Sequence, residues 1–206
     1  MDTPDGEVRG STVSKITIQH TDGALVVPAA KGFDGRVMLG EATVVDLGDG
    51  RYLFVLLGND SAQLREAHRE AYDAATKGGG NWIPRWMNAL ERQTTPRPVP
   101  PEYYPLLVTF GDINDPASVR RVDPADLAAT FGAGFGLREI TLEVTDDAAT
   151  EGVVEGVFDY FTWPKEKRKE YRCSVGDCLR FPLKIPNPDG TTTILTGGDF
   201  TARKLQ

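Results

Sequence analysis

Residues 110–126, FGDINDPASVRRVDPAD, could bind a metal ion or catalyse hydrolysis. Carboxylate and amide oxygens bind divalent cations, and paired carboxylates can act as general acid and base. The side chains of this kind are Asp112, Asn114, Asp115, Asp123 and Asp126. These side chains either bind a metal ion or take part in catalysis, or they stabilise turns and helix starts through hydrogen bonds.

The positions of three of these aspartates favour a structural role. Asp123 stands directly before Pro124, which is typical of a helix start, because the carboxylate accepts a free N–H and proline has none to lose. Asp126 would then lie in the first turn, where the helix dipole favours negative charge. Asp115 precedes Pro116 in the same way and indicates a turn or a single 3₁₀ turn.

Asp112 and Asn114 do not complete a calcium loop. Such a loop needs acids at alternate positions, a glycine and a final glutamate. We therefore predict that the aspartates cap turns and hold no metal. A carboxylate- or metal-dependent hydrolase at Asp112 and Asp115 is the alternative.

The glycines of residues 131–136, FGAGFG, resemble a phosphate-binding loop in composition only. A dinucleotide-binding loop leaves a strand and enters a helix, so that the phosphate meets the helix N-terminus. Here a predicted helix precedes the loop and a predicted strand follows it. Gly132 is therefore expected to end the helix, with Gly134 and Gly136 in the loop.

Cys173 and Cys178 are separated by four residues. Zinc would need two more ligands, and the chain contains only His20 and His68. His68 lies on the apolar stripe of a predicted helix, where a buried histidine with satisfied hydrogen bonds is expected. Two free thiols, a small disulfide and a metal site all remain open for the cysteines.

The chain contains no G-x-S-x-G, H-E-x-x-H or phosphate-loop motif. With two histidines there is also little scope for a Ser-His-Asp triad. The sequence therefore predicts neither a catalytic residue nor a cofactor.

A basic stretch follows Trp163-Pro164. Its cations are Lys165, Lys167, Arg168, Lys169 and Arg172, and it also contains Glu166 and Glu170. If Pro164 begins a helix, Lys165, Lys169 and Arg172 share one face at spacings of four and three. We predict that this face binds an acidic protein partner. A solvated helix face is the alternative.

Composition places the chain among ordinary globular proteins. It has 206 residues, 40% hydrophobic and 26% charged, and a net charge of −7. An acidic surface repels phosphate backbones, so a general nucleic-acid binder is not expected. No run reaches the roughly 18 apolar residues of a membrane helix. We predict one α+β domain over residues 1–206.

The N-terminal residues contain neither a basic start nor an apolar stretch, so no signal peptide is predicted in them. The chain as written would be cytoplasmic. However, Thr3-Pro4-Asp5-Gly6 is turn chemistry with only two residues before it, which suggests that an earlier strand is missing. If a signal preceded that strand, the protein would be periplasmic or anchored as a lipoprotein.

Hydrophobic patterns predict a mostly antiparallel sheet. Residues 12–20 alternate as a half-buried strand, and residues 24–40 read as a loop because glycines disperse the pattern. Residues 41–47 and 51–57 flank Gly48-Asp49-Gly50 and predict a hairpin, with a fully covered second strand. Further strands are expected at 106–110 and 137–145, and a turn at 187–190.

Two central helices are expected on one face of the sheet. Residues 61–76 carry an apolar stripe and end at Gly78-Gly79-Gly80, and residues 84–92 begin at a proline. Leu64, Tyr72, Trp82 and Trp86 should lie where the helices meet the sheet. A short helix is predicted at 123–132. The proline-rich residues 94–105 form an extended connector inside the domain.

Three stretches resemble a family of uncharacterised bacterial proteins: residues 3–13, 40–57 and 104–146. The quoted stretches cover about one third of the chain. The resemblance implies a bacterial origin and, in some members, an additional first strand behind a lipoprotein-type signal. It implies no activity and no catalytic residues. Together these observations predict a non-catalytic interaction module, and a signal of this kind would associate it with the bacterial envelope.

Overall fold

The computed structural model describes residues 1–21, 32–58, 60–164, 167, 183–187 and 189–202. Within these residues the fold is α+β, as predicted, and all the paired strands are antiparallel. No described helix has the length and apolar character needed to cross a membrane.

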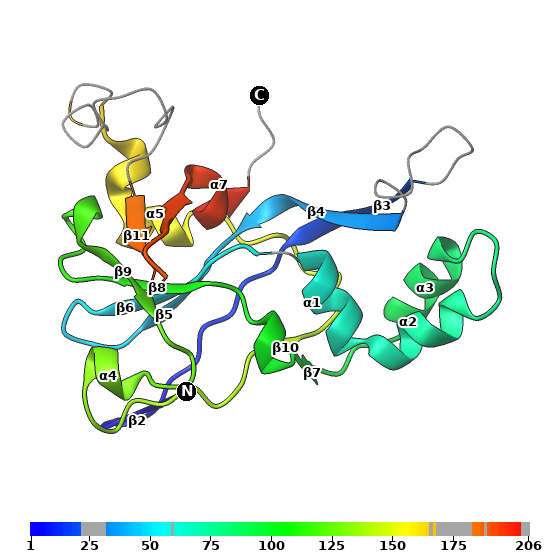
Figure 1. Ribbon diagram of the computed structural model, residues 1–206, viewed down its shortest axis with the longest axis horizontal. Coiled ribbons are helices and arrows are strands. Elements are labelled where there is room, and N and C mark those ends of the chain that lie inside the picture. Colours follow the sequence, from blue (N-terminus) through cyan, green and yellow to red (C-terminus); the bar gives the residue numbers. More distant parts are fainter. Residues whose placement is uncertain (22–31, 59, 165–166, 168–182, 188, 203–206) are drawn as a thin grey trace.

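The largest sheet has the strand order β5-β6-β8-β9 (Figure 1). Its strands are β5 (Thr43–Asp46), β6 (Tyr52–Val55), β8 (Leu107–Phe110) and β9 (Val119–Val122). β5 and β6 form the predicted hairpin, and Gly48, Asp49 and Gly50 in its turn all have positive φ. The strand at 106–110 is confirmed as β8, whereas β9 was not predicted.

Successive side chains of β6 and β8 point to opposite faces of this sheet, and both faces are buried. Phe54 and Val108 belong to one hydrophobic cluster, and Leu53 and Leu107 belong to a second. The first face is covered by the elements α5 (Val153–Val157), η4 (Asp159–Thr162), β11 (Leu183–Pro186), β12 (Thr192–Leu195) and α7 (Gly197–Phe200). The prediction that the second hairpin strand is covered on both faces is therefore confirmed.

The second face is covered by the N-terminal hairpin and by the segment around the short helix α4 (Ala128–Phe131). The hairpin joins β1 (Asp2–Thr3) to β2 (Gly6–Glu7), so two residues before the turn are enough for pairing. The prediction that Asp123 begins a helix over 123–132, with Asp126 in its first turn, is wrong, because α4 begins at Ala128. Asp123 Oδ1 accepts the N–H of Ala125 in a turn, and Asp126 Oδ1 accepts the N–H of Ala129 at the helix start.

A second sheet has the order β13-β4-β3, with β3 (Lys15–Thr21), β4 (Gly32–Glu41) and β13 (Thr201–Ala202). The prediction of a loop over 24–40 is wrong for residues 32–40. Their glycines weaken the hydrophobic pattern, but antiparallel pairing with β3 supplies the hydrogen bonds of a strand. The strand predicted at 12–20 begins at Lys15.

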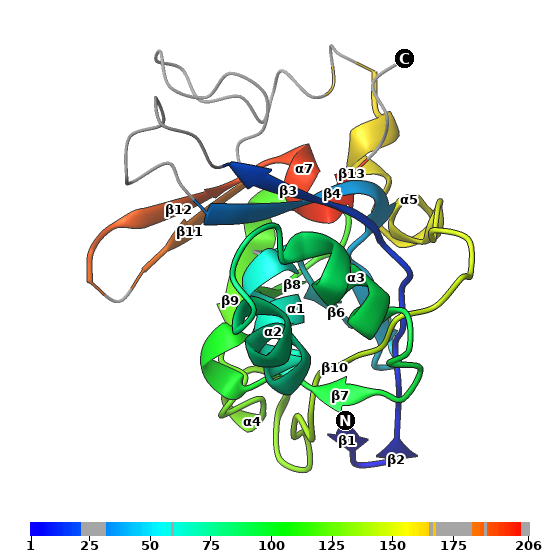
Figure 2. The same cartoon turned by 90° about the vertical axis from the view of Figure 1, so that its right-hand side faces the viewer.

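The helices are α1 (Asp60–Ala67), α2 (Arg69–Thr76) and α3 (Ile83–Leu90), and they lie on one side of the β3–β4 ribbon (Figure 2). The single helix predicted at 61–76 is wrong, because His68 has φ −115° and ψ 39° and separates α1 from α2. The helix predicted at 84–92 is confirmed as α3, with Pro84 in its first turn.

The predicted seam between helices and sheet is confirmed. Leu64, Tyr72, Trp82 and Trp86 belong to one cluster with Ile18 of β3. The Tyr72 ring lies 5.2 Å from that of Trp82 and 5.4 Å from that of Trp86, measured between centroids. Leu64 and Tyr72 are both partly buried, so the expected helix phase is right.

The remaining elements are small. The connector 94–105 contains β7 (Arg97–Pro98) and the 3₁₀ helix η2 (Pro101–Tyr103). The strand predicted at 137–145 pairs only over β10 (Thr141–Leu142), with β7. Ile140, Leu142 and Val144 are nevertheless less exposed than their neighbours, as in a half-buried strand. The turn at 187–190 is confirmed between β11 and β12, with Gly190 at φ 81°.

Candidate functional site

The aspartate loop between β8 and β9 is held by bonds to its own backbone. Asp112 Oδ1 accepts the N–H of Asn114 at 2.9 Å and the Asn114 side-chain amide at 3.2 Å. Asp115 Oδ1 accepts the N–H of Ala117 at 2.9 Å and caps the 3₁₀ helix η3 (Pro116–Ser118). The Ser118 hydroxyl lies within hydrogen-bond distance of the carbonyl oxygens of Asp112 and Asp115, at 2.8 and 2.6 Å.

These contacts confirm that the aspartates cap turns. The described residues contain no group of three or more histidine, cysteine, aspartate or glutamate side chains placed to hold a metal ion. Gly132, in the glycine-rich stretch, has φ 103° and ends α4 as predicted.

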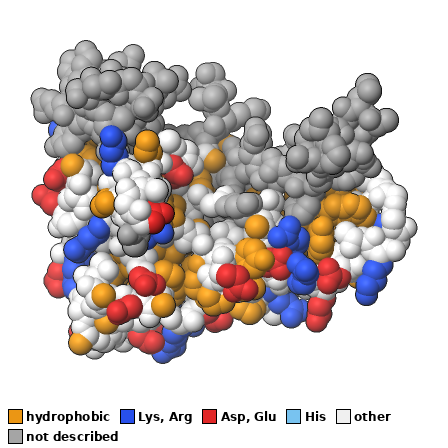
Figure 3. Space-filling view, in the orientation of Figure 1, with side chains coloured by type: hydrophobic (Ala, Val, Ile, Leu, Met, Phe, Trp, Pro, Cys, Tyr) orange, Lys and Arg blue, Asp and Glu red, His pale blue; other side chains and the backbone are white. Residues whose placement is uncertain are grey.

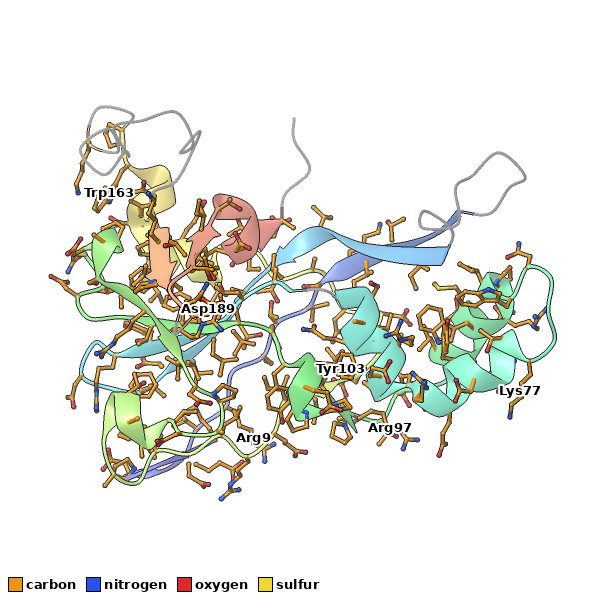
Figure 4. The ribbon with its side chains drawn as sticks, viewed as in Figure 1. Arg9, Lys77, Arg97, Tyr103, Trp163 and Asp189 are labelled. Atoms are coloured by element: carbon orange, nitrogen blue, oxygen red, sulfur yellow. The ribbon has the colours of Figure 1, made fainter. Side chains whose placement is uncertain are left out.

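The predicted partner-binding residues Lys165, Lys169 and Arg172 lie outside the described residues, as do Cys173 and Cys178. Lys167 is described and exposed. Its ammonium lies 3.3 Å from the centroid of the Trp163 ring, a cation–π contact (Figure 4 labels Trp163). One cation of the basic segment, Lys167, therefore lies on a side chain that belongs to the hydrophobic core.

Trp163 is itself firmly placed. It is 7% exposed, its indole N–H donates to Asp159 Oδ1 at 2.7 Å, and its ring packs edge-on against Tyr160. Tyr160 and Trp163 belong to the cluster that covers the first face of the central sheet. A cation seated on this indole is thus fixed relative to the sheet.

His68 is buried, as predicted, with 4% of its surface exposed. The prediction that its hydrogen bonds are satisfied is wrong for the described residues, among which neither Nδ1 nor Nε2 has a partner. Burial lowers the pKa of His68, and the positive charge of Arg97 lowers it further.

Glu41 is a functional candidate that sequence patterns missed. It is 1% exposed, and its two carboxylate oxygens accept the N–H groups of Gly152 at 2.6 Å and Val154 at 3.0 Å. The carboxylate therefore caps α5 from the end of β4. Only its position at the end of a weakly patterned strand marks it in the sequence, and that is too little to identify it.

Two exposed polar clusters tie distant segments together. Arg138 pairs with Asp2 and Glu7 on the N-terminal hairpin, and its hydrogen bond lowers the pKa of Asp2. Arg121 of β9 donates to Asn187 Oδ1 at 3.0 Å in the β11–β12 turn. Both clusters join surface loops, and their groups are engaged with one another.

The charged side chains over α1 and α2 also neutralise one another (Figure 3). Glu66 pairs with Arg65 at 2.7 Å and with Arg69 at 2.8 Å, and Arg69 pairs with Asp73 at 3.3 Å. Both arginines of these helices are paired, and the helices carry more acids than bases, so this surface offers no basic patch for an acidic partner.

Comparison of the chain with protein-family models, with curated proteins and with solved structures finds no match in any of the three.

Proposed function

We propose that the protein is a non-catalytic interaction module of bacterial origin, associated with the envelope, that binds an acidic protein partner through Lys165, Lys169 and Arg172. The observation that carries the proposal is the contact between Lys167 and Trp163. It holds one cation of the basic segment, Lys167, on a side chain of the hydrophobic core.

Charge supports this choice of segment. The whole chain carries −7, whereas residues 165–172 contain five cations and two glutamates. Basic side chains concentrated on an acidic protein attract an acidic partner locally, while the rest of the surface repels it. The paired charges on α1 and α2 offer no comparable surface.

The aspartate loop favours a binding function over a catalytic one. The carboxylates of Asp112 and Asp115 each accept a backbone N–H bond from their own loop, so one oxygen of each is already used to shape the chain. The alternative hydrolase would use these two side chains, which lie on one loop where the backbone N–H of Asp115 donates to the backbone carbonyl of Asp112 at 3.0 Å.

The test is capture of partners from a lysate of the native host by the purified chain. Changing Lys165, Lys169 and Arg172 to Glu should remove the captured proteins, and about 1 M salt should release them from the unchanged chain, since the Debye length is then about 3 Å. The matched control changes Lys77, Arg92 and Arg120 to Glu, which are three exposed cations elsewhere. An unchanged set of proteins with the first variant would contradict the proposal.

Metal titration by calorimetry tests the alternative. Binding of Mn²⁺ or Mg²⁺ at micromolar concentration, lost on Asp112→Ala and retained on Asp126→Ala, would favour the hydrolase. We expect no such difference between the two variants.

A further inference from the structure

The junction between α1 and α2 is a hinge at His68, where the backbone dihedral angles leave the helical range although the hydrogen bonds continue. The N–H of His68 donates to Leu64 O at 3.1 Å, and its carbonyl accepts from Tyr72 N at 3.1 Å. The helical bonds therefore continue on both sides, while the backbone of His68 leaves the helical region. The two helices meet at an angle at this residue (Figure 1).

The imidazole at this hinge is buried without a hydrogen-bond partner among the described residues. A neutral imidazole tolerates such a site at moderate cost. A charged one does not, because burial removes its hydration and nothing replaces it. The folded junction therefore selects the neutral form of His68.

The charged and titratable groups around the junction do not offset this. Arg97 of β7 repels a proton on His68, and it lies beside the junction (Figure 4). On α1, Arg65 pairs with Glu66, so that Glu66 is already neutralised. Tyr72 on α2 and Tyr103 on η2 are the neighbouring phenols, both close enough to interact with Arg65. The β10 residues Thr141 and Leu142 carry no charge.

The helices beyond the hinge have a small core. Ala75, Trp86 and Leu90 are its buried residues, packed with partly buried side chains that include Ile18 of β3 and Val144. A modest free energy is enough to loosen such a unit while the central sheet stays folded.

We propose that His68 is a pH-sensitive latch, whose protonation in mildly acidic solution releases α2 and α3 from the rest of the fold. This inference concerns conformational regulation and is independent of the proposed partner-binding segment. Opening the hinge admits water to the imidazole, which stabilises the charged form.

The direction in which pH changes the stability of the closed state follows from the difference between the pKa of His68 in the closed and open states. The pKa of His68 in the closed state is below the ordinary 6.5. Well above pH 6.5 the imidazole is neutral in both the open and the closed state, and the closed state keeps its full stability. As the pH falls below it, the open state takes up the proton first, so closure weakens progressively until the lowered pKa of the closed state is passed.

Hydrogen exchange at single peptides tests the latch. Between about pH 7.5 and about pH 5, after correction for intrinsic rates, residues 69–90 should lose about tenfold in protection while β6 and β8 do not change. His68→Leu and His68→Gln cannot take a charge, and both should abolish the loss. The matched control His20→Gln, at the other histidine of the chain, should keep it.

Each remaining outcome overturns the latch. It would be excluded if the His68 variants lost protection as the native chain does, or if His20→Gln removed the effect. Equal loss in β6 and β8 would instead indicate general acid unfolding. A single well-folded variant of the two at position 68 is enough for the comparison.

Discussion

The buried polar groups Glu41 and Thr109 of the sheet strands and the buried His68 of the helix region differ in their hydrogen bonding. In the sheet region, Glu41 and Thr109 are each 1% exposed and hydrogen-bonded, Thr109 through its hydroxyl to Tyr52 O at 2.7 Å. In the helix region, His68 is 4% exposed, and its ring has no such bond among the described residues. A satisfied polar group stabilises one arrangement, whereas an unsatisfied titratable group makes stability depend on solution conditions.

The apolar packing is also more extensive around the sheet than among the three helices. The sheet carries a buried cluster on each face, and Phe54, Phe110, Phe158 and Phe200 pack ring against ring in one of them. The hydrophobic cluster of the helix region has three buried residues, Ala75, Trp86 and Leu90. The comparison indicates that the sheet determines global stability and the helices open first.

The largest expected effect comes from truncating one buried ring in each region. Phe54→Ala should lower the free energy of unfolding by about 3–5 kcal/mol, because the side chain is fully buried and contacts three aromatic rings. Trp86→Ala removes an equally buried side chain, but hydrogen exchange should speed up mainly in residues 69–90. Equal acceleration in β8 would show that the two regions unfold as one.

The next effect concerns the buried carboxylate. Glu41→Ala leaves the N–H groups of Gly152 and Val154 without their acceptors and should lower stability by about 2–3 kcal/mol in urea unfolding. Glu41→Gln keeps one acceptor oxygen and should lose less. If the alanine variant were as stable as the native chain, the cap would have no energetic role.

A methyl group placed in each region sharpens the comparison further. A Cβ at Gly10 would lie 2.6 Å from Val44 O of β5, so Gly10→Ala should lower stability by about 1–3 kcal/mol. At Gly78 the nearest atoms, at 3.3 and 3.4 Å, are at the end of the long Arg85 side chain, which has to shift by only a few tenths of an ångström. Thermal unfolding of Gly78→Ala should change by less than about 0.5 kcal/mol, and the reverse order of the two variants would contradict this packing.

A further small effect is expected at the aspartate loop. Asp115→Ala removes the acceptor of Ala117 N–H and should cost about 1 kcal/mol in urea unfolding. Asp115→Asn keeps an acceptor and should stay within a few tenths of a kcal/mol. A large loss with asparagine would point to a role for the negative charge beyond capping.

Features with a local cause could be predicted from the sequence. The β5–β6 hairpin followed from Gly48-Asp49-Gly50, and the caps at Asp115 and Gly132 followed from the residues beside them. These residue types meet a local backbone requirement, positive φ or a free N–H, which is independent of the rest of the fold.

Features that depend on contacts between distant segments could not be predicted from the sequence. β4 contains glycines that hide its pattern and is a strand because β3 pairs with it. Neither proline nor glycine stands at His68, so helix propensity predicts continuity across the break. The role of Glu41 depends on Gly152 and Val154, more than 100 residues away in the chain.

Site-specific photo-crosslinking in cells of the native host tests the proposed function most directly. A benzoylphenylalanine at Arg168 stands in the basic segment, and one at Asn114 stands in the exposed aspartate loop. We predict a crosslinked protein partner from position 168 that disappears when Lys165, Lys169 and Arg172 are changed to Glu, and none from position 114. A partner crosslinked from position 114 and absent at position 168 would contradict the account.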